Sequence, residues 1–174
     1  MGIPLIEQVK IQAQVLVPLV RTLQAELGEE RANALVRKSL GALYRQFGDA
    51  WWRAHRETKA NERLGKAFEA FAAGDAIDYQ IVKQTPDAFE LNVTGCRYAK
   101  FYQELGAPEL GFLLTCDVDF PFTEGFGGDV QLTRTQTIMQ GASHCDFRYK
   151  LKREKEDKRL KRRRHKQRGS ARER

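Results

Sequence analysis

The amino-acid sequence predicts an α+β domain: an N-terminal helical segment, then a four-stranded, largely antiparallel sheet with two short helices between its strand pairs. Over residues 1–75, apolar residues recur every three or four positions, which is the period of amphipathic helices. Over residues 76–151, two pairs of alternating segments are separated by helical ones, and strands grouped in this way indicate an α+β fold. A length of 174 residues suits one domain, which we assign to residues 1–151.

Three helices are expected in the helical part. Residues 4–27 and 29–53 each carry a wide apolar stripe, and Gly28 between them is a suitable helix stop. A third helix is expected over 61–73, ending at a turn that begins with Gly74. The first two stripes are wide for a domain of this size, so we expect a homo-oligomer, most simply a two-fold dimer.

The sheet-containing part alternates between strand and helix signals. The expected elements are strands over 77–83 and 88–94, helices over 97–105 and 109–116, and strands over 130–139 and 145–151. The sequence Thr-Pro-Asp at 85–87 predicts a hairpin turn between the first two strands. Pro108 suits the first turn of the second helix.

The C-terminal residues differ in composition from the rest. The last 25 residues carry 14 of the 30 Lys and Arg residues but only 4 of the 23 Asp and Glu residues. Residues 152–174 lack the apolar surface needed to fold alone, so we expect a disordered basic tail. The remainder is mildly acidic, so we expect nucleic acid to bind only non-specifically, through the tail.

Cellular location is inferred from two absences. The sequence shows no signal peptide and no run of roughly 18 or more apolar residues, so we expect a cytoplasmic protein without membrane contact. Three cysteines are an odd number, which disfavours a fold held together by disulfides alone. In a reducing compartment these thiols would be free for chemistry or for metal binding.

Chemically versatile side chains gather in the segment 96–149. It holds all three cysteines of the chain, one of the three histidines, and acidic residues directly after two of the cysteines. Thiol, imidazole and carboxylate groups serve as nucleophiles, bases and metal ligands. Cys96, Cys116 and Cys145 each fall at the end of an expected element, and such ends can converge at one edge of a small domain.

Two sequence blocks resemble the L-2-amino-thiazoline-4-carboxylic acid hydrolase family. They read NVTGCRYAKFYQELGAPELGFLLTCDVDF over 92–120 and LTRTQTIMQGASHCDFRY over 132–149, and the Gly-Ala-Ser-His-Cys-Asp-Phe piece is the most specific. The resemblance implies an enzyme that opens the cyclic amidine of a small-molecule substrate to a carbamoyl-cysteine. It covers about a third of the chain closely, and the basic tail is not part of it.

Ring opening requires an attacking group at the electron-poor C2, a proton donor for the leaving atom and a cation for the ring carboxylate. The candidate catalytic residues are Cys96, Cys116, His144, Cys145, Asp117, Asp119 and Asp146. Arg134, within the strand expected over 130–139, is the main candidate for a bidentate clamp on the substrate carboxylate, and Arg97 is a second one.

Two alternatives stay open. The sequence defines no cofactor, but Cys96, Cys116, Cys145 and His144 are the residues that would hold a divalent metal such as zinc, although their spacing includes no Cys-x2-Cys pair. A small-molecule-binding or sensing domain without turnover, similar to vinyl-reductase-type ligand domains, is the other reading. Such a domain needs an apolar pocket, and its thiols could be metal-bound and closed to solvent.

Overall fold

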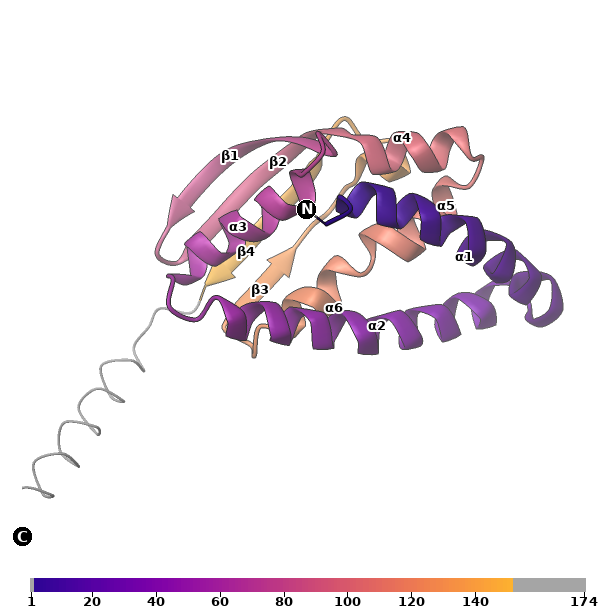
Figure 1. The fold of residues 1–174 in the computed structure, drawn as a ribbon, viewed down its shortest axis with the longest axis horizontal. Coiled ribbons are helices and arrows are strands. Elements are labelled where there is room, and N and C mark those ends of the chain that lie inside the picture. The colour runs from indigo at the N-terminus through magenta and orange to yellow at the C-terminus, as the bar shows by residue number, and fades with distance from the viewer. Residues whose placement is uncertain (1, 152–174) are drawn as a thin grey trace, which may run out of the picture.

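The computed structural model describes residues 2–151 and confirms the α+β class (Figure 1). In chain order the elements are α1 (Leu5–Leu27), α2 (Glu29–Ala54), α3 (Ala60–Ala72), β1 (Ile77–Thr85), β2 (Ala88–Cys96), α4 (Arg97–Glu104), α5 (Pro108–Gly111), the π-helical turn η1 (Phe112–Cys116), α6 (Asp119–Glu124), β3 (Val130–Thr133), the 3-10 turn η2 (Ile138–Gln140) and β4 (Cys145–Leu151). The basic tail expected over 152–174 lies outside the described residues.

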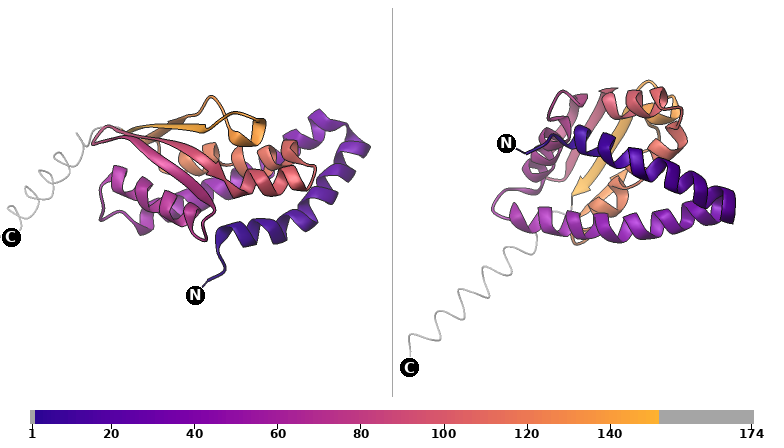
Figure 2. Two further views of the ribbon diagram at one scale, coloured as in Figure 1. Left: turned by 90° about the horizontal axis from the view of Figure 1, so that it is seen from above. Right: turned by 45° about the vertical axis from the view of Figure 1, so that its right-hand side comes forward.

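The four strands form one sheet in the order β1-β2-β4-β3, with every neighbouring pair antiparallel. In β2, Phe89, Leu91 and Val93 are buried while Glu90 and Asn92 between them are half-buried, as alternation predicts for a sheet with one covered face. The helices α1 to α3 lie on one side of this sheet (Figure 2).

The first two helices form a long antiparallel hairpin (Figure 1). The chain reverses at Gly28, whose φ of +80° lies in the region that favours glycine. Apolar residues at helical spacing bury one face of α1, among them Ile6, Ala13 and Val17. Within residues 2–151, neither this helix nor any other combines the length and apolar character that crossing a membrane requires.

Helix α2 crosses α6 at very short range, because glycines stand at the contact. A Cβ atom added to Gly48 would lie 1.9 Å from the carbonyl oxygen of Phe122. One added to Gly125 would lie 2.3 Å from the carbonyl oxygen of Arg45. This crossing holds the segment from η1 to α6, and therefore Asp119, against α2.

Buried side chains form two apolar clusters. One joins α1 to α4, α5 and η1, and the other joins α3 to the covered face of the sheet. Cys96 and Ile138 pack against both clusters, so the end of β2 and the turn η2 lie at their boundary.

Three details differ from the sequence prediction. The strand expected over 130–139 ends at Thr133, because the amides of Thr135 and Gln136 donate to the Asp146 carboxylate at 2.9 Å each instead of to a neighbouring strand. The helix expected over 109–116 divides into α5 and η1. Helix α6 had no expected counterpart, since only Asp119–Glu124 form it and the segment has no long apolar period.

Candidate functional site

An ion pair between Arg134 and Asp119 lies at the centre of the candidate site. Arg134 follows β3 rather than lying within it, and its side chain is only 3% exposed. One guanidinium nitrogen, Nη1, donates to the Asp119 carboxylate, and the other, Nη2, donates to the carbonyl oxygen of Cys116 at 3.0 Å. The sequence suggested that Arg134 clamps the substrate, but here its fork is directed at the protein's own acid.

Two aromatic rings complete the surroundings of Arg134. Its Cζ atom lies 5.2 Å from the centre of the Phe120 ring and 5.1 Å from that of Phe147. Rings at this range attract a guanidinium and exclude water from it. The cation is therefore fixed by one carboxylate, one carbonyl and two rings.

Asp119 is the first residue of α6, and its carboxyl group titrates near neutral pH. Burial raises its pKa to about 6, although the neighbouring Arg134 acts in the opposite direction. A quarter of its side-chain surface is still exposed, and one carboxylate oxygen, Oδ2, accepts from Arg134. A carboxylate with these properties suits a general base that works near neutrality.

All three thiols lie in the same region of the interior, since charge interactions connect Cys116 with Cys96, Cys145, Asp119 and Arg134. Burial raises the pKa of Cys96 to about 11 and also raises the pKa values of Cys116 and Cys145. The thiols are therefore protonated at neutral pH, and a protonated thiol is a weak nucleophile.

Two of the sulfur atoms accept backbone hydrogen bonds. Sγ of Cys96 accepts from the Ala99 amide at 3.4 Å, where it caps α4, and Sγ of Cys145 accepts from the Ile138 amide at 3.2 Å. These contacts give the two cysteines structural roles at the ends of β2 and β4.

The remaining predicted acids have other partners. The Asp117 carboxylate forms an ion pair with Arg37 of α2 at 2.7 Å. Although burial alone would raise the pKa of Asp146, hydrogen bonds from Thr135 and Gln136 lower it. Asp146 thus anchors the loop that delivers Arg134 to the site.

His144 and Arg97 also have local partners. The His144 ring lies 3.0 Å from the Ser143 hydroxyl and 3.2 Å from the Gln136 amide nitrogen. Arg97 donates to the Gly74 carbonyl oxygen at 2.7 Å and ties α4 to the turn before β1. Neither contact involves the Asp119–Arg134 pair.

The suggested zinc ligands do not fit a metal site. Across residues 2–151, no group of three or more His, Cys, Asp and Glu side chains is arranged to hold a metal ion. The set Cys96, Cys116, Cys145 and His144 therefore gains no geometric support.

Sequence reasoning missed Tyr149 and Thr123 beside Asp119. Burial raises the pKa of Tyr149, and the charge of Asp119 adds to that effect. The Thr123 hydroxyl donates to the backbone carbonyl of Asp119 at 2.8 Å. Tyr149 follows the alternating pattern of a core strand and Thr123 lies in the short helix α6, so no local signal marks either residue.

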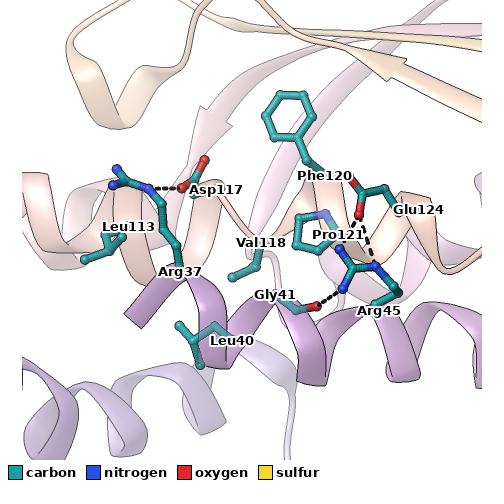
Figure 3. A pocket seen from close by; sticks show the side chains of 10 residues that line it. All are labelled: Arg37, Leu40, Gly41, Arg45, Leu113, Asp117, Val118, Phe120, Pro121 and Glu124. Atoms are coloured by element: carbon teal, nitrogen blue, oxygen red, sulfur yellow. Dashed lines mark hydrogen bonds and ion pairs between the residues drawn. The ribbon is translucent and has the colours of Figure 1, made fainter. Parts of the chain in front are cut away.

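A surface pocket of about 320 Å³ opens between α2 and the η1–α6 segment (Figure 3). It combines charged and apolar side chains, and its lining residues are Arg37, Leu40, Gly41, Arg45, Leu113, Asp117, Val118, Phe120, Pro121 and Glu124. Phe120 is shared with the buried pair, because the same ring lies beside the Arg134 guanidinium.

Together these features define an α+β domain with a buried carboxylate–arginine pair, neutral thiols around it and a charged pocket alongside. A sequence model of the L-2-amino-thiazoline-4-carboxylic acid hydrolase family matches residues 8–149. The chain belongs to this family.

No curated protein matches the chain by sequence. Among solved structures, the phenol-responsive sensory domain of the transcription activator PoxR with phenol aligns with a TM-score of 0.49 and 13% identity, covering 84% of this chain and 77% of that one. The Fe(II) unliganded H-NOX protein from K. algicida aligns with a TM-score of 0.43 and 11% identity, covering 82% and 75%.

Proposed function

We propose that this protein is a hydrolase that opens a small cyclic amidine, such as 2-aminothiazoline-4-carboxylate, to a carbamoyl-cysteine. Membership of the family supports the class of reaction. The observation that carries the proposal is the Asp119 carboxyl group, partly exposed and with a pKa of about 6, held in place by the buried Arg134.

In the proposed reaction Asp119 acts as general base towards water. One proton of the water passes to the carboxylate while its oxygen bonds to C2, and the π pair of the C=N bond at C2 moves to nitrogen, which takes that proton from Asp119 and leaves a tetrahedral carbon. The C2 hydroxyl then gives its proton to Asp119 as the carbonyl forms, one of the two ring bonds at C2, to sulfur or to nitrogen, breaks, and the departing atom takes that proton from Asp119. The product is the substrate plus one water, so no other reactant is needed.

Water is a better candidate for the attacking group than a thiol. The pKa values of Cys96, Cys116 and Cys145 are all raised by burial, so little thiolate exists at neutral pH. Arg134 is a positioning residue in this scheme: it orients Asp119 and limits the rise in that carboxyl group's pKa.

A binding or sensing domain without turnover is the second candidate. The observation that favours it is that Arg134 already has partners within the protein. Two of its nitrogens donate to Asp119 and to the Cys116 carbonyl oxygen, so they are not available to a reacting substrate. A neutralised pair among protonated thiols would also suit a pocket that only holds a ligand.

The two candidates differ in product formation. The full-length protein is incubated with 2-aminothiazoline-4-carboxylate, and mass spectrometry follows a product heavier by one water. Turnover in the wild type that falls by roughly a hundredfold or more in Asp119→Asn supports the hydrolase, since this is the usual contribution of a general base. The control is Asp49→Asn, because Asp49 is an acid of α2 that pairs with exposed Arg53.

Two results would contradict the proposal. Binding of the compound without any product would identify a ligand-binding domain. Equal turnover in the wild type and in a folded Asp119→Asn variant would remove Asp119 from the mechanism.

A further inference from the structure

The pocket between α2 and α6 has charged ends and an apolar middle. Arg37 pairs with Asp117 at 2.7 Å at one end, and Arg45 pairs with Glu124 at the other. The two arginines are eight residues apart on α2, which places them about 12 Å apart along the helix axis. Between them the wall is formed by apolar side chains, Leu40, Val118 and Pro121 (Figure 3).

Gly41 keeps the middle of this pocket open. It lies in the interior of α2, one turn from each arginine, where glycine destabilises a helix relative to alanine. Packing does not require glycine there, because an added Cβ would lie 3.9 Å from the Cβ of Pro121, an ordinary contact. Gly48 on the same helix is different, since a Cβ there would lie 1.9 Å from a carbonyl oxygen. The absence of a side chain at Gly41 therefore leaves space in the pocket, and the contact between α2 and α6 does not require it.

The arginines can exchange their partners at low cost. About half of each arginine side chain is exposed, and exposed ion pairs contribute little to stability. Glu124 is 58% exposed against 26% for Asp117, so the Arg45–Glu124 pair is the easier one to open. A ligand carboxylate could then take the place of Glu124 on the guanidinium fork, which matches carboxylate geometry.

The pocket adjoins the proposed catalytic acid. Val118 and Phe120, the residues on either side of Asp119, both line it. The Phe120 ring also lies 5.2 Å from the Cζ atom of Arg134, the partner of Asp119. Phe120 therefore belongs both to the pocket wall and to the surroundings of the buried pair.

We propose that this pocket is the recognition site for a small ring compound with a carboxylate, in which Arg45 binds the carboxylate and the ring lies over Val118 and Pro121 beside Gly41. The identity of the ligand rests on the proposed function, because 2-aminothiazoline-4-carboxylate combines a small flat ring with one carboxylate. In this proposal Arg45 of α2 binds the substrate carboxylate, the role that the sequence suggested for Arg134.

The binding test uses 2-aminothiazole-4-carboxylate, an aromatic analogue whose ring resists hydrolysis, with calorimetry on the full-length protein. Arg45→Ala should weaken binding by roughly ten- to a hundredfold, the cost of losing a charged hydrogen-bond partner. Gly41→Leu should weaken it comparably by filling the pocket, and Gly41→Ala should have a smaller effect while keeping the helix folded. Arg53→Ala is the matched control, since Arg53 lies on the same helix, outside the pocket, and pairs with Asp49.

Parallel turnover measurements separate this proposal from the hydrolase function. If turnover of the thiazoline occurs with the same KM in Gly41→Leu and Arg45→Ala as in the wild type, the pocket assignment is overturned and the hydrolase stands. If the analogue binds in an Arg45-dependent way while no variant turns over the thiazoline, the pocket stands and the hydrolase fails. Equal affinity in all four variants, or no affinity in the wild type, would also overturn the pocket assignment.

Discussion

At the level of single residues, Asp119 matters most, because burial and Arg134 act on its charge in opposite directions. Burial is the stronger effect and raises the pKa to about 6. A base must be deprotonated to accept a proton, so the proposed reaction needs the ionised carboxylate. We predict that kcat/KM falls about tenfold for each pH unit below about 6, measured as the pH profile of ring opening. A profile that stays flat down to pH 5 would show that Asp119 is not the base.

The same carboxyl group should make stability depend on pH. Its pKa is 3.8 in the absence of the fold and about 6 in the folded protein, so the folded state binds more protons between these values. Stability contributed by protonated Asp119 is fully present below about pH 3.8 and is lost as pH rises through about 6. In urea unfolding, the unfolding free energy of the wild type relative to that of Asp119→Asn should therefore fall as pH rises through this range. If the unfolding free energies of the two proteins change with pH in parallel, the prediction is wrong.

Cysteine substitutions test whether the thiols take part in the reaction. We predict that Cys96→Ala, Cys116→Ala and Cys145→Ala each keep most of the turnover. Each should lose about 1 kcal/mol of unfolding free energy, the scale of a small buried deletion. Activity and urea unfolding are measured on the same preparations. One variant that is as stable as the wild type but inactive would restore a thiol as the attacking group.

At the level of elements, the crossing of α2 and α6 holds Asp119 and one wall of the pocket in place. Gly48→Ala would place a methyl group 1.9 Å from the Phe122 carbonyl oxygen, so the helices must separate. We predict a loss of about 2 kcal/mol or more in unfolding free energy, as for an overpacked core. Thermal and urea unfolding measure it.

Gly65 in α3 is the matched control for this crossing. An added Cβ there meets nothing within 4 Å, so Gly65→Ala should be neutral or stabilising by up to about 1 kcal/mol. Similar losses in both variants would mean that the helix crossing is not the cause.

For the whole molecule, association through α1 remains a prediction. Ile11, Val15 and Leu19 are 58%, 66% and 50% exposed. They recur every four residues and so form one stripe, on the side of α1 away from its buried face. We predict a two-fold dimer in sedimentation at micromolar concentration and a shift towards monomer in Val15→Lys. A wild type that sediments as a monomer would contradict this expectation.

Local sequence patterns were sufficient for most of the secondary structure. The hairpin β1–β2, the helices α1 to α4 and the strand β4 follow from apolar periods and turn residues that act within a few positions of the chain. The same patterns failed where a distant side chain replaced a local contact. The strand after Val130 stops early because Asp146, eleven residues beyond Thr135, takes the amides that a strand would have used.

In the candidate site, too, local sequence predicted some features and distant contacts decided others. The sequence by itself placed the thiols, acids and Arg134 in one segment, because residue types and their order are local facts. Only the tertiary structure decided that Arg134 meets Asp119, that Asp117 meets Arg37 of a helix 80 positions earlier, and that His144 meets Gln136. Burial is likewise a property of the packed molecule, and it raises the pKa values of Cys96 and Cys116 and that of Asp119, the last to about 6.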